Sequence, residues 1–198
     1  MKENRSFEAR SDEEMAYIRY EEDLLLGEVS LAGKKILDIG SNKPEFADYL
    51  KGLYPDTKVT SVDMKPIKGI SARVEEGNLP FLNDSFDYVI SHAGVTNNNA
   101  ESIKLSIVEG LRVLRQNGEM RIGPIGDADV EENDEKKIEI VLKYLEELQT
   151  KHLISFKLIP VRHWRSVQGY DVVEYCLAIR KPENAEHVPL VESPELNS

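Results

Sequence analysis

Short apolar runs bounded by turn-forming residues alternate with amphipathic stretches along most of the chain. An apolar run of this kind indicates a buried strand, whereas apolar side chains spaced three and four residues apart indicate a helix. Regular alternation of the two favours a mostly parallel sheet with helices on both faces. The pattern predicts strands at residues 34–39, 58–63, 70–74, 86–91 and 119–125, and helices at residues 44–53, 99–115 and 127–148.

The two ends of the chain depart from this alternation. Ser11 and Glu14 form a capping-box pattern, which predicts a helix that runs to about Leu26 and is ended by Gly27. Near the other end, residues 153–161 and 171–181 predict two strands joined only by the loop from Arg162 to Gly169. Such a loop is too short for a parallel crossover, so we expect one antiparallel strand at or near an edge of the sheet.

Turn residues and composition shifts predict the remaining boundaries. Pro44 suits the first position of a helix, and Asn117 with Gly118 is expected to end the helix that precedes them. We expect a helical segment over residues 1–30 and one doubly wound α/β domain over residues 31–181. Residues 182–198 contain three prolines and no periodicity, and we expect a disordered tail there.

Composition narrows the classes of function. The chain has 198 residues, enough for one core, and its formal net charge of -11 disfavours binding to nucleic acid or to an anionic membrane surface. Cys176 is the single cysteine, so no internal disulfide and no cysteine–histidine metal cluster is expected. Asp127 and Asp129 do not form a calcium-loop pattern. The N-terminus lacks a signal-peptide pattern and the apolar runs are short, so we expect a cytoplasmic protein without membrane spans.

Polar residues gather where the predicted strands end. Asp38 and Gly40 close the first strand, Asp63 closes the second, and Ser91 and His92 close the fourth. In open α/β sheets, ligands bind beyond the carboxyl ends of the strands. Asp63 follows Gly40 by roughly 20 residues, the spacing at which an acidic side chain meets a ribose diol in a nucleotide-binding unit. The sequence therefore predicts a nucleotide-like ligand at this edge.

Five stretches together resemble class I S-adenosylmethionine-dependent methyltransferases, of the small methyltransferase-domain type. The resemblance covers about residues 34–181, and its most specific part is the run LPFLNDSFDYVIS followed by a helix that ends in LRVLRQNG. These are two of the five stretches, and the second continues into the strand GEMRIGPI. The other three are KKILDIGSNKPEF, KVTSVDMKP and the closing VEYCLAIRKP.

This resemblance implies a seven-stranded sheet of order 3-2-1-4-5-7-6, with strand seven antiparallel. It implies S-adenosylmethionine as cofactor and methyl transfer to a small-molecule or glycan-like acceptor. Asp38 and Gly40 would lie under the methionine moiety, Asp63 would hold the ribose, and Glu75, Glu76 and Asn78 would lie near the adenine. The implied cofactor-binding residues are Asp38, Gly40, Ser41, Asn42, Asp63, Met64, Glu75, Glu76, Asn78 and Ser91.

The chain departs from the family pattern in two places. In the family, the glycine-rich loop after the first strand usually reads D-x-G-x-G-x-G. Asn42 and Pro44 stand at the second and third glycine positions of this loop. Asn tolerates a positive φ, and Lys43 is able to pair with a ligand carboxylate, so we expect the loop to keep its function. The segment between the second and third strands is also too short for a helix. Either an extended segment makes this connection, or the third strand is very short.

Several side chains allow more than one interpretation. His92 lies where the reacting face is expected and is the candidate general base, although a lone histidine more often has a packing role. Tyr17 and Tyr20 either pack against the first helix's neighbours or close a substrate pocket. His163 and Trp164, in the last loop, are candidates for shaping an acceptor site.

Two other functions are consistent with a fold of this kind. The altered loop is the reason to consider a non-catalytic binding module or partner subunit, because a fold can persist after its cofactor affinity is lost. The second is a nicotinamide-dependent dehydrogenase, which requires the motif G-x-G-x-x-G. The chain from Gly40 reads GSNKPE with a single glycine, so the sequence disfavours this function.

Overall fold

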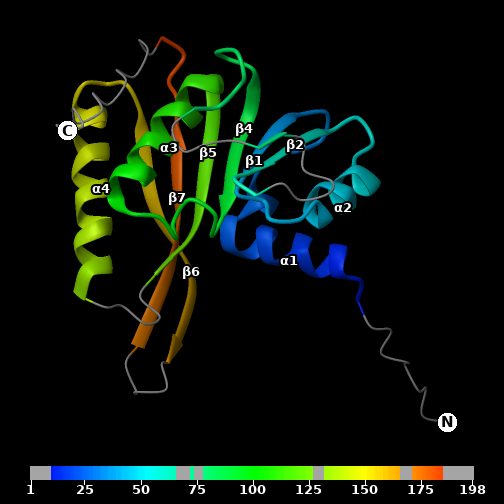
Figure 1. The fold of residues 1–198 in the computed structure, drawn as a ribbon, viewed down its shortest axis with the longest axis horizontal. Helices are drawn as coiled ribbons and strands as arrows, with labels where there is room; N and C mark the ends of the chain where they lie inside the picture. The colour runs from blue at the N-terminus through cyan, green and yellow to red at the C-terminus, as the bar shows by residue number, and fades with distance from the viewer. Residues whose placement is uncertain (1–9, 66–71, 74–77, 127–131, 166–170, 185–198) are drawn as a thin grey trace.

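Seven strands form one sheet in the computed structural model, which describes residues 10–65, 72–73, 78–126, 132–165 and 171–184. The strand order is β3-β2-β1-β4-β5-β7-β6, which confirms the predicted doubly wound α/β sheet (Figure 1). The strands are β1 Lys35–Ile39, β2 Lys58–Asp63, β3 Ala72–Arg73, β4 Phe86–His92, β5 Leu114–Gly126, β6 Ser155–Arg165 and β7 Asp171–Arg180.

Strand directions agree with the expectation drawn from loop length. β3, β2, β1, β4 and β5 pair in parallel, whereas β7 is antiparallel to both β5 and β6. β7 is next to the edge strand β6. Of the two connections expected between strands two and three, the structure has the short strand, because β3 pairs with β2 only at Val62–Ala72 and Asp63–Arg73.

The described ranges contain four α-helices, which pack on the sheet: α1 Asp12–Leu24, α2 Glu45–Leu53, α3 Ala100–Val113 and α4 Glu132–Thr150. The Ser11 hydroxyl accepts a hydrogen bond from the Glu14 N–H, as the capping-box pattern predicts. Asn99 caps α3 in the same way, through the Ser102 N–H. These caps satisfy N–H groups that the first turn of a helix leaves unpaired.

The structure corrects three predicted helix boundaries. α1 ends at Leu24 because Leu25, not Gly27, adopts the left-handed conformation, and a short 3-10 turn at Leu26–Glu28 follows. Pro44 is the N-cap of α2 and not its first helical residue. Asn117 and Gly118 do not end α3, because β5 already begins at Leu114 and pairs with Phe86 of β4.

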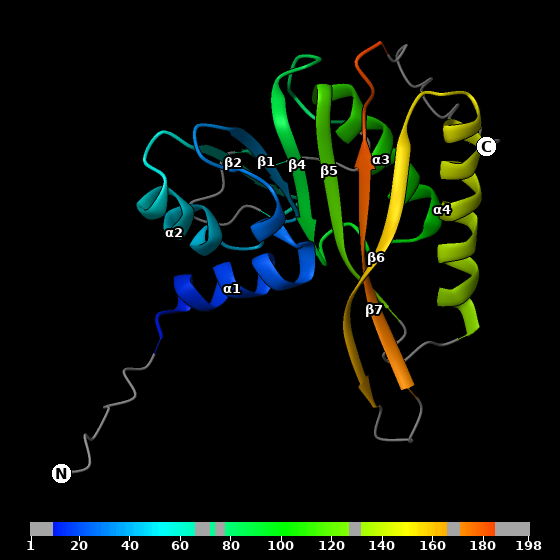
Figure 2. The same ribbon diagram turned by 180° about the vertical axis from the view of Figure 1, so that it is seen from behind.

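The last hairpin also differs from its prediction. β6 extends to Arg165, so His163 and Trp164 lie in a strand and not in a loop. They pair with Val173 and Val172 of β7, and the hairpin projects beyond the rest of the sheet (Figures 1 and 2). Pairing with β7 thus extends β6 beyond residue 161, where the apolar pattern of the sequence ends.

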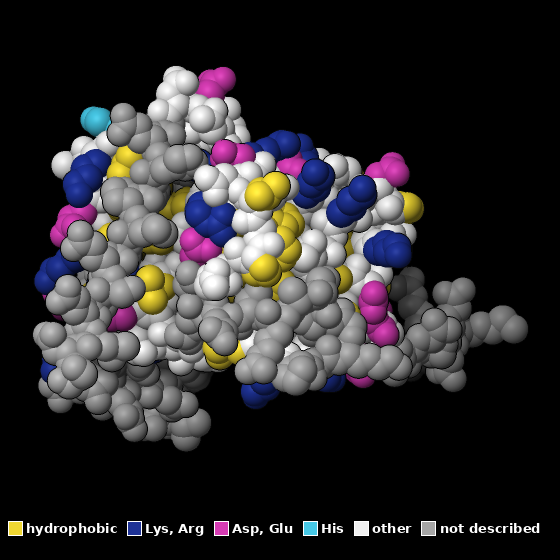
Figure 3. Space-filling model, turned by 45° about the horizontal axis from the view of Figure 1, so that its top comes forward, with side chains coloured by type: hydrophobic (Ala, Val, Ile, Leu, Met, Phe, Trp, Pro, Cys, Tyr) yellow, Lys and Arg dark blue, Asp and Glu magenta, His cyan; other side chains and the backbone are white. Residues whose placement is uncertain are grey.

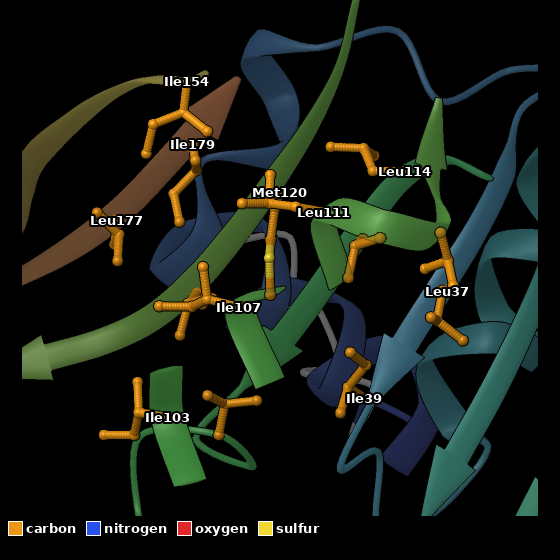
Figure 4. Close-up of a cluster of buried hydrophobic side chains, with 14 of the residues drawn as sticks. Leu37, Ile39, Ile103, Ile107, Leu111, Leu114, Met120, Ile154, Leu177 and Ile179 are labelled. Carbon is orange, nitrogen blue, oxygen red and sulfur yellow. The ribbon is translucent and has the colours of Figure 1, made fainter. Parts of the chain in front are cut away.

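The two faces of the sheet have separate hydrophobic clusters. α3 and α4 cover one face, and α1 and α2 cover the other (Figures 1 and 2). The α3/α4 cluster is drawn in Figure 4, where side chains of α3 meet those of β1, β5 and β7. The α1/α2 cluster is smaller and comprises Tyr20, Leu24, Leu26, Leu31, Ile36, Phe46, Leu50 and Ile90.

One face of the described surface is mixed in charge. Figure 3 turns the top of Figure 1 toward the viewer, and there Lys and Arg side chains are interspersed with Asp and Glu side chains among the residues shown in colour. No helix in the described part of the chain is both long and apolar enough to cross a membrane. The division into residues 1–30, 31–181 and 182–198 stays a prediction.

Candidate functional site

A cleft of about 880 Å³ lies at the carboxyl ends of β1, β2 and β4. α1 supplies one wall, with Asp12, Met15, Ala16, Arg19 and Tyr20 among its lining residues. In Figure 2, β4 points toward α1, which runs across the end of this strand. The cleft lies where α/β sheets of this topology bind ligands, and its volume is in the upper range of small-molecule sites.

The turn after β1 depends on two glycines. Gly40 has a φ of +72°, and a Cβ placed on it would lie 2.6 Å from the Cα of Gly94 in the loop after β4. A Cβ on Gly94 would in turn lie 2.7 Å from the Cα of Gly40. Only residues without a side chain allow two backbones to approach so closely. The loops after β1 and β4 therefore form one packed wall of the cleft.

Asn42 and Asp63 join the ends of β1 and β2. Asn42 has a φ of +56°, so the loop keeps a left-handed residue at a position where the family has glycine. The Asn42 N–H donates to Asp63 Oδ2 at 3.0 Å, and the Lys65 N–H donates to Oδ1 at 2.9 Å. An ionised carboxylate has about four acceptor sites, so each oxygen keeps one for a ligand hydroxyl.

Two residues of the implied cofactor set are fully buried and do not line the cleft. Ser91 Oγ donates to the Ile39 carbonyl at 2.8 Å and accepts from the Val95 N–H at 3.0 Å. Ser91 therefore holds the loop after β4 against the end of β1. Asp38 accepts hydrogen bonds of 3.3 Å at both carboxylate oxygens from the Tyr20 hydroxyl. Both side chains support the wall from behind.

Burial changes the proton affinity of this pair. Burial of the Asp38 carboxyl raises its pKa from 3.8 to about 8, against the opposing effect of the Tyr20 hydrogen bond; the nearby Asp63 carboxylate raises it further. Burial and the Asp38 carboxylate also raise the pKa of Tyr20. Tyr20 therefore stays a hydrogen-bond donor across the working range of pH.

Tyr20 is also the centre of an aromatic stack at the cleft wall. Its ring lies 4.3 Å from the Phe46 ring and 4.8 Å from the His92 ring, both in stacked geometry. Tyr17 packs on Phe46 and Tyr49 and is not among the lining residues of the cleft. Of the two roles considered for these tyrosines, Tyr17 has the packing role, whereas Tyr20 both packs and lines the cleft.

His92 is held from α1. Its Nε2 lies 2.7 Å from Asp23 Oδ2, and Asp23 is only 2% exposed. The other oxygen of Asp23 accepts from the guanidinium of Arg162 in β6. Asp23 stands in the acidic run YEEDLLL and was not among the residues predicted from the sequence. Its signal is its position three residues after Tyr20, which places the two on one helical face.

The cleft is also lined by Leu79, Ser106 and Glu109. The Leu79 N–H donates to Glu109 Oε2 at 2.9 Å, and Arg112 also donates to Glu109. Burial opposes ionisation, but these hydrogen bonds outweigh it and lower the pKa of Glu109. Glu109 is thus an ionised side chain that fixes the segment beginning at Leu79. The sequence placed it on the helix but gave it no role.

The other implied cofactor residues have mixed positions. Gly40, Ser41, Asn42, Asp63 and Met64 line the cleft, and so does His92, the candidate general base. Asn78 is exposed and is not among the lining residues, and Glu75 and Glu76 lie outside the described residues, as do Asp127 and Asp129. Lys43 lines the cleft and pairs with Glu45 at 3.1 Å. His163 and Arg162 lie in β6, and neither is among the lining residues.

The residues present fit S-adenosylmethionine. Ser41 Oγ is buried at the cleft wall without a hydrogen-bond partner in the described part of the chain, so it is available to a polar ligand atom. Asp63 offers free carboxylate acceptors for a diol, and Met64 beside it is half exposed for contact with a flat base. Arg19 and Lys43 bring positive charge to the same cleft, which suits a carboxylate.

Similar folds occur among solved structures. A S-adenosylmethionine-dependent methyltransferase from Methanosarcina mazei has a TM-score of 0.56 and 16% identity, with 82% of this chain and 97% of that chain covered. An arsenic(III) S-adenosylmethionine methyltransferase from Chlamydomonas reinhardtii has a TM-score of 0.56 and 16% identity, over 78% and 65% of the two chains. A [4+2]-cyclase has a TM-score of 0.55 and 12% identity, over 86% and 81%.

These similarities establish the fold. The chain has the fold of class I S-adenosylmethionine-dependent methyltransferases, as the resemblance in sequence implied. A scan against protein-family models finds no match, and a search of curated proteins finds none either. Since a [4+2]-cyclase also has a similar fold, the fold alone does not identify the reaction, which depends on the residues of the cleft.

Proposed function

We propose that this protein is an S-adenosylmethionine-dependent methyltransferase that acts on a small-molecule acceptor. The proposal is carried by the cleft at the ends of β1, β2 and β4, in which a glycine turn and a strand-end carboxylate lie side by side. The fold and the nature of the lining groups both support it. When bound, the cofactor supplies a methyl group on a positively charged sulfur.

The residues of the cleft have separate roles in this proposal. Asp63 accepts hydrogen bonds from the ribose hydroxyls, with its carboxylate oriented by the Asn42 and Lys65 N–H groups. The Gly40 turn with Ser41 and Asn42 lies along the methionine part, and Met64 lies along the base. Asp38 and Ser91 act from behind the wall: Asp38 fixes Tyr20, and Ser91 fixes the loop after β4.

His92 is the proposed catalytic residue. Its ring lines the cleft beside the Gly94 loop and is held at one nitrogen by Asp23. Methyl transfer to a hydroxyl or to a protonated amine requires that a proton leave the acceptor, and a positioned imidazole accepts it. The remaining contribution of the protein is to align the reactants and exclude water.

The acceptor is proposed to be small, including sugar-like molecules. The net charge of -11 opposes a polyanionic acceptor such as nucleic acid. The cleft contains both acidic and basic lining residues, so it suits a polar molecule and not a purely apolar one. The cytoplasm is the proposed site of action.

A second function, that of a non-catalytic partner subunit, is favoured by one observation. Asp38, which the resemblance places under the methionine moiety, is fully buried and covered by Tyr20. If the cofactor needs direct contact with Asp38, α1 has to move before binding. Lack of cofactor binding by a folded sample would support this second function and contradict the first.

Calorimetric titration with S-adenosylmethionine and with its demethylated product tests the proposal. We expect micromolar binding of both. A folded sample that binds neither would overturn the methyltransferase proposal. Titration with NAD and NADP serves as the control for general nucleotide affinity, and we expect no binding, since the loop lacks the dinucleotide fingerprint.

Substitution of Asp63 tests the assignment of the ribose site. Asp63→Ala should lower cofactor affinity by about 1–3 kcal/mol, because the ribose hydroxyls lose a charged acceptor. Asp63→Asn keeps an oxygen for the Asn42 N–H and should lower affinity less. Asp56→Asn, an exposed aspartate before β2, is the matched control and should bind like the wild type. Equal affinity in all four proteins would contradict the assignment.

A further inference from the structure

The histidine at the cleft is anchored through one nitrogen only. His92 Nε2 contacts Asp23 Oδ2 at 2.7 Å, whereas Nδ1 has no hydrogen-bond partner in the described part of the chain. A carboxylate accepts hydrogen bonds, so this contact assigns the proton of the neutral ring to Nε2. Nδ1 then carries the free lone pair. His92 is a lining residue of the cleft, and a ring held in this way keeps one basic nitrogen available.

Asp23 belongs to a charged cluster that joins α1 to β6 and β7. Arg162 contacts both Asp23 and Glu174, so two carboxylates share one guanidinium. By formal charge this cluster keeps one excess negative charge beside the His92 ring. The other group facing the ring is Tyr20, whose hydroxyl donates to Asp38. Asp23 is buried, so its charge acts at short range and with little screening.

From these contacts we infer that Asp23 is a positioning residue for His92, and that the methyl acceptor is a hydroxyl group. This inference rests on the proposed methyltransferase function. A hydroxyl is a poor nucleophile until its proton leaves, whereas an amine free base or a carboxylate already has a reactive lone pair. An Asp23–His92 pair therefore adds most to attack by oxygen.

The reaction step balances with the groups named. His92 Nδ1 takes the proton of the acceptor hydroxyl as its oxygen forms the bond to the methyl carbon. The bond from that carbon to sulfur breaks, and its electron pair stays on the sulfur, which becomes neutral. The positive charge of the donor is thus replaced by the charge of the imidazolium, which Asp23 stabilises.

The first experiment identifies the chemical class of the product. The protein is incubated with S-adenosylmethionine labelled in the methyl group and with a deproteinised small-molecule extract of its source cells. We expect label in a methyl ether, which is stable to base. Label released by base as methanol, label in a methylated amine, or no labelled product would each overturn the inference.

Two variants separate positioning from packing. Asp23→Asn keeps the shape of the side chain but cannot balance the imidazolium, and should lower transfer about 10- to 100-fold with cofactor affinity unchanged. Glu22→Gln removes the exposed carboxylate next to Asp23 on α1 and is the matched control, and transfer should stay unchanged. Equal loss in both variants would mean that Asp23 acts only through the overall charge of α1, and would overturn the inference.

A spectroscopic measurement makes the test independent of turnover. In protein labelled with 15N-histidine, the His92 ring is assigned by comparison with His92→Gln. We expect the wild-type ring to carry its proton on Nε2 and Asp23→Asn to lose this preference. A proton on Nδ1 in the wild type would overturn the inference, even if the variant fails to fold. Cofactor titration of the wild type tests the underlying function separately, since failure of the inference leaves that binding intact.

Discussion

The two faces of the sheet are built from different kinds of side chain. Under α3 and α4, the buried cluster is almost wholly aliphatic and extends from Leu37 of β1 to Ile179 of β7 (Figure 4). Under α1 and α2, the buried set includes an aromatic stack and the acidic side chains of Asp23 and Asp38. The first face contributes mostly hydrophobic stabilisation, whereas the interior of the second includes polar groups that border the cleft.

The difference follows from where the cleft opens. α1 lines the cleft with polar side chains such as Arg19 and Tyr20. Behind this wall, two buried carboxylates have Tyr20, His92 and Arg162 as partners. α3 reaches the cleft only at Ser106 and Glu109 and is otherwise free to bury aliphatic side chains. One face is therefore mainly a hydrophobic core, and the other combines a core with the wall of the cleft.

The largest expected effect is on the aliphatic face. Ile107→Ala in α3 should lower the free energy of unfolding by about 2–5 kcal/mol, since Ile107 is fully buried and its loss leaves a cavity. Urea denaturation measures this loss, and cofactor affinity of the folded protein should stay unchanged. Ile140→Ala in α4, which is 45% exposed, is the matched control and should change stability by less than about 0.5 kcal/mol. Similar losses in both would contradict the division between the faces.

A pH-dependent effect is expected on the polar face. Between its ordinary value of 3.8 and its folded pKa of about 8, Asp38 keeps a proton in the folded chain that the unfolded chain has lost. The contribution of Asp38 to stability therefore falls as pH rises through this window, by at most roughly 1.4 kcal/mol per pH unit, and is constant above it. Asp38→Asn removes the titration.

Urea denaturation at pH 5, 6, 7 and 8 tests this expectation. The free energy of unfolding of Asp38→Asn should fall less steeply with pH than that of the wild type. Asp56→Asn, which is exposed, should keep the wild-type slope. Equal slopes in the wild type and Asp38→Asn would mean that Asp38 is ionised in the folded protein.

The smallest expected energy change tests the wall of the cleft that the Gly40 and Gly94 loops form. Gly40→Ala should lower cofactor affinity about tenfold, which corresponds to roughly 1.4 kcal/mol, because its Cβ would displace Gly94 and open the loop pair. Gly52→Ala is the matched control, since nothing lies within 4 Å of its Cβ and it stands inside α2. It should raise stability by about 0.5–1 kcal/mol and leave affinity unchanged. Calorimetric titration measures both affinities.

Helix and strand positions were largely predictable, because burial on one face imposes a period that the sequence shows directly. The errors fall where local signals compete with packing. Gly27 was expected to end α1, but Leu25 takes the left-handed turn and Leu26 is buried beside it. Asn117 and Gly118 resemble a helix end, yet β5 begins earlier because Leu114 pairs with β4.

The candidate site was predictable in part. Strand ends meet at one edge of a parallel sheet, and this rule brought Gly40, Asn42, Asp63 and His92 to one cleft. The same rule could not distinguish a side chain that faces the cleft from one that supports its wall. Asp38 and Ser91 proved to be of the second kind, because Tyr20 and the Val95 loop cover them.

By itself, the amino-acid sequence determined the order of elements, the mostly parallel sheet and the edge at which the cleft opens, since these follow from local periodicity, loop length and the meeting of parallel strand ends at one edge. Only the tertiary structure decided how α1 lies across the strand ends. That packing pairs Asp23 with His92 across 69 positions of the chain and buries Asp38 beneath Tyr20. Contacts of this kind depend on distance in space and on the desolvation of charge, and no local pattern of residues contains either.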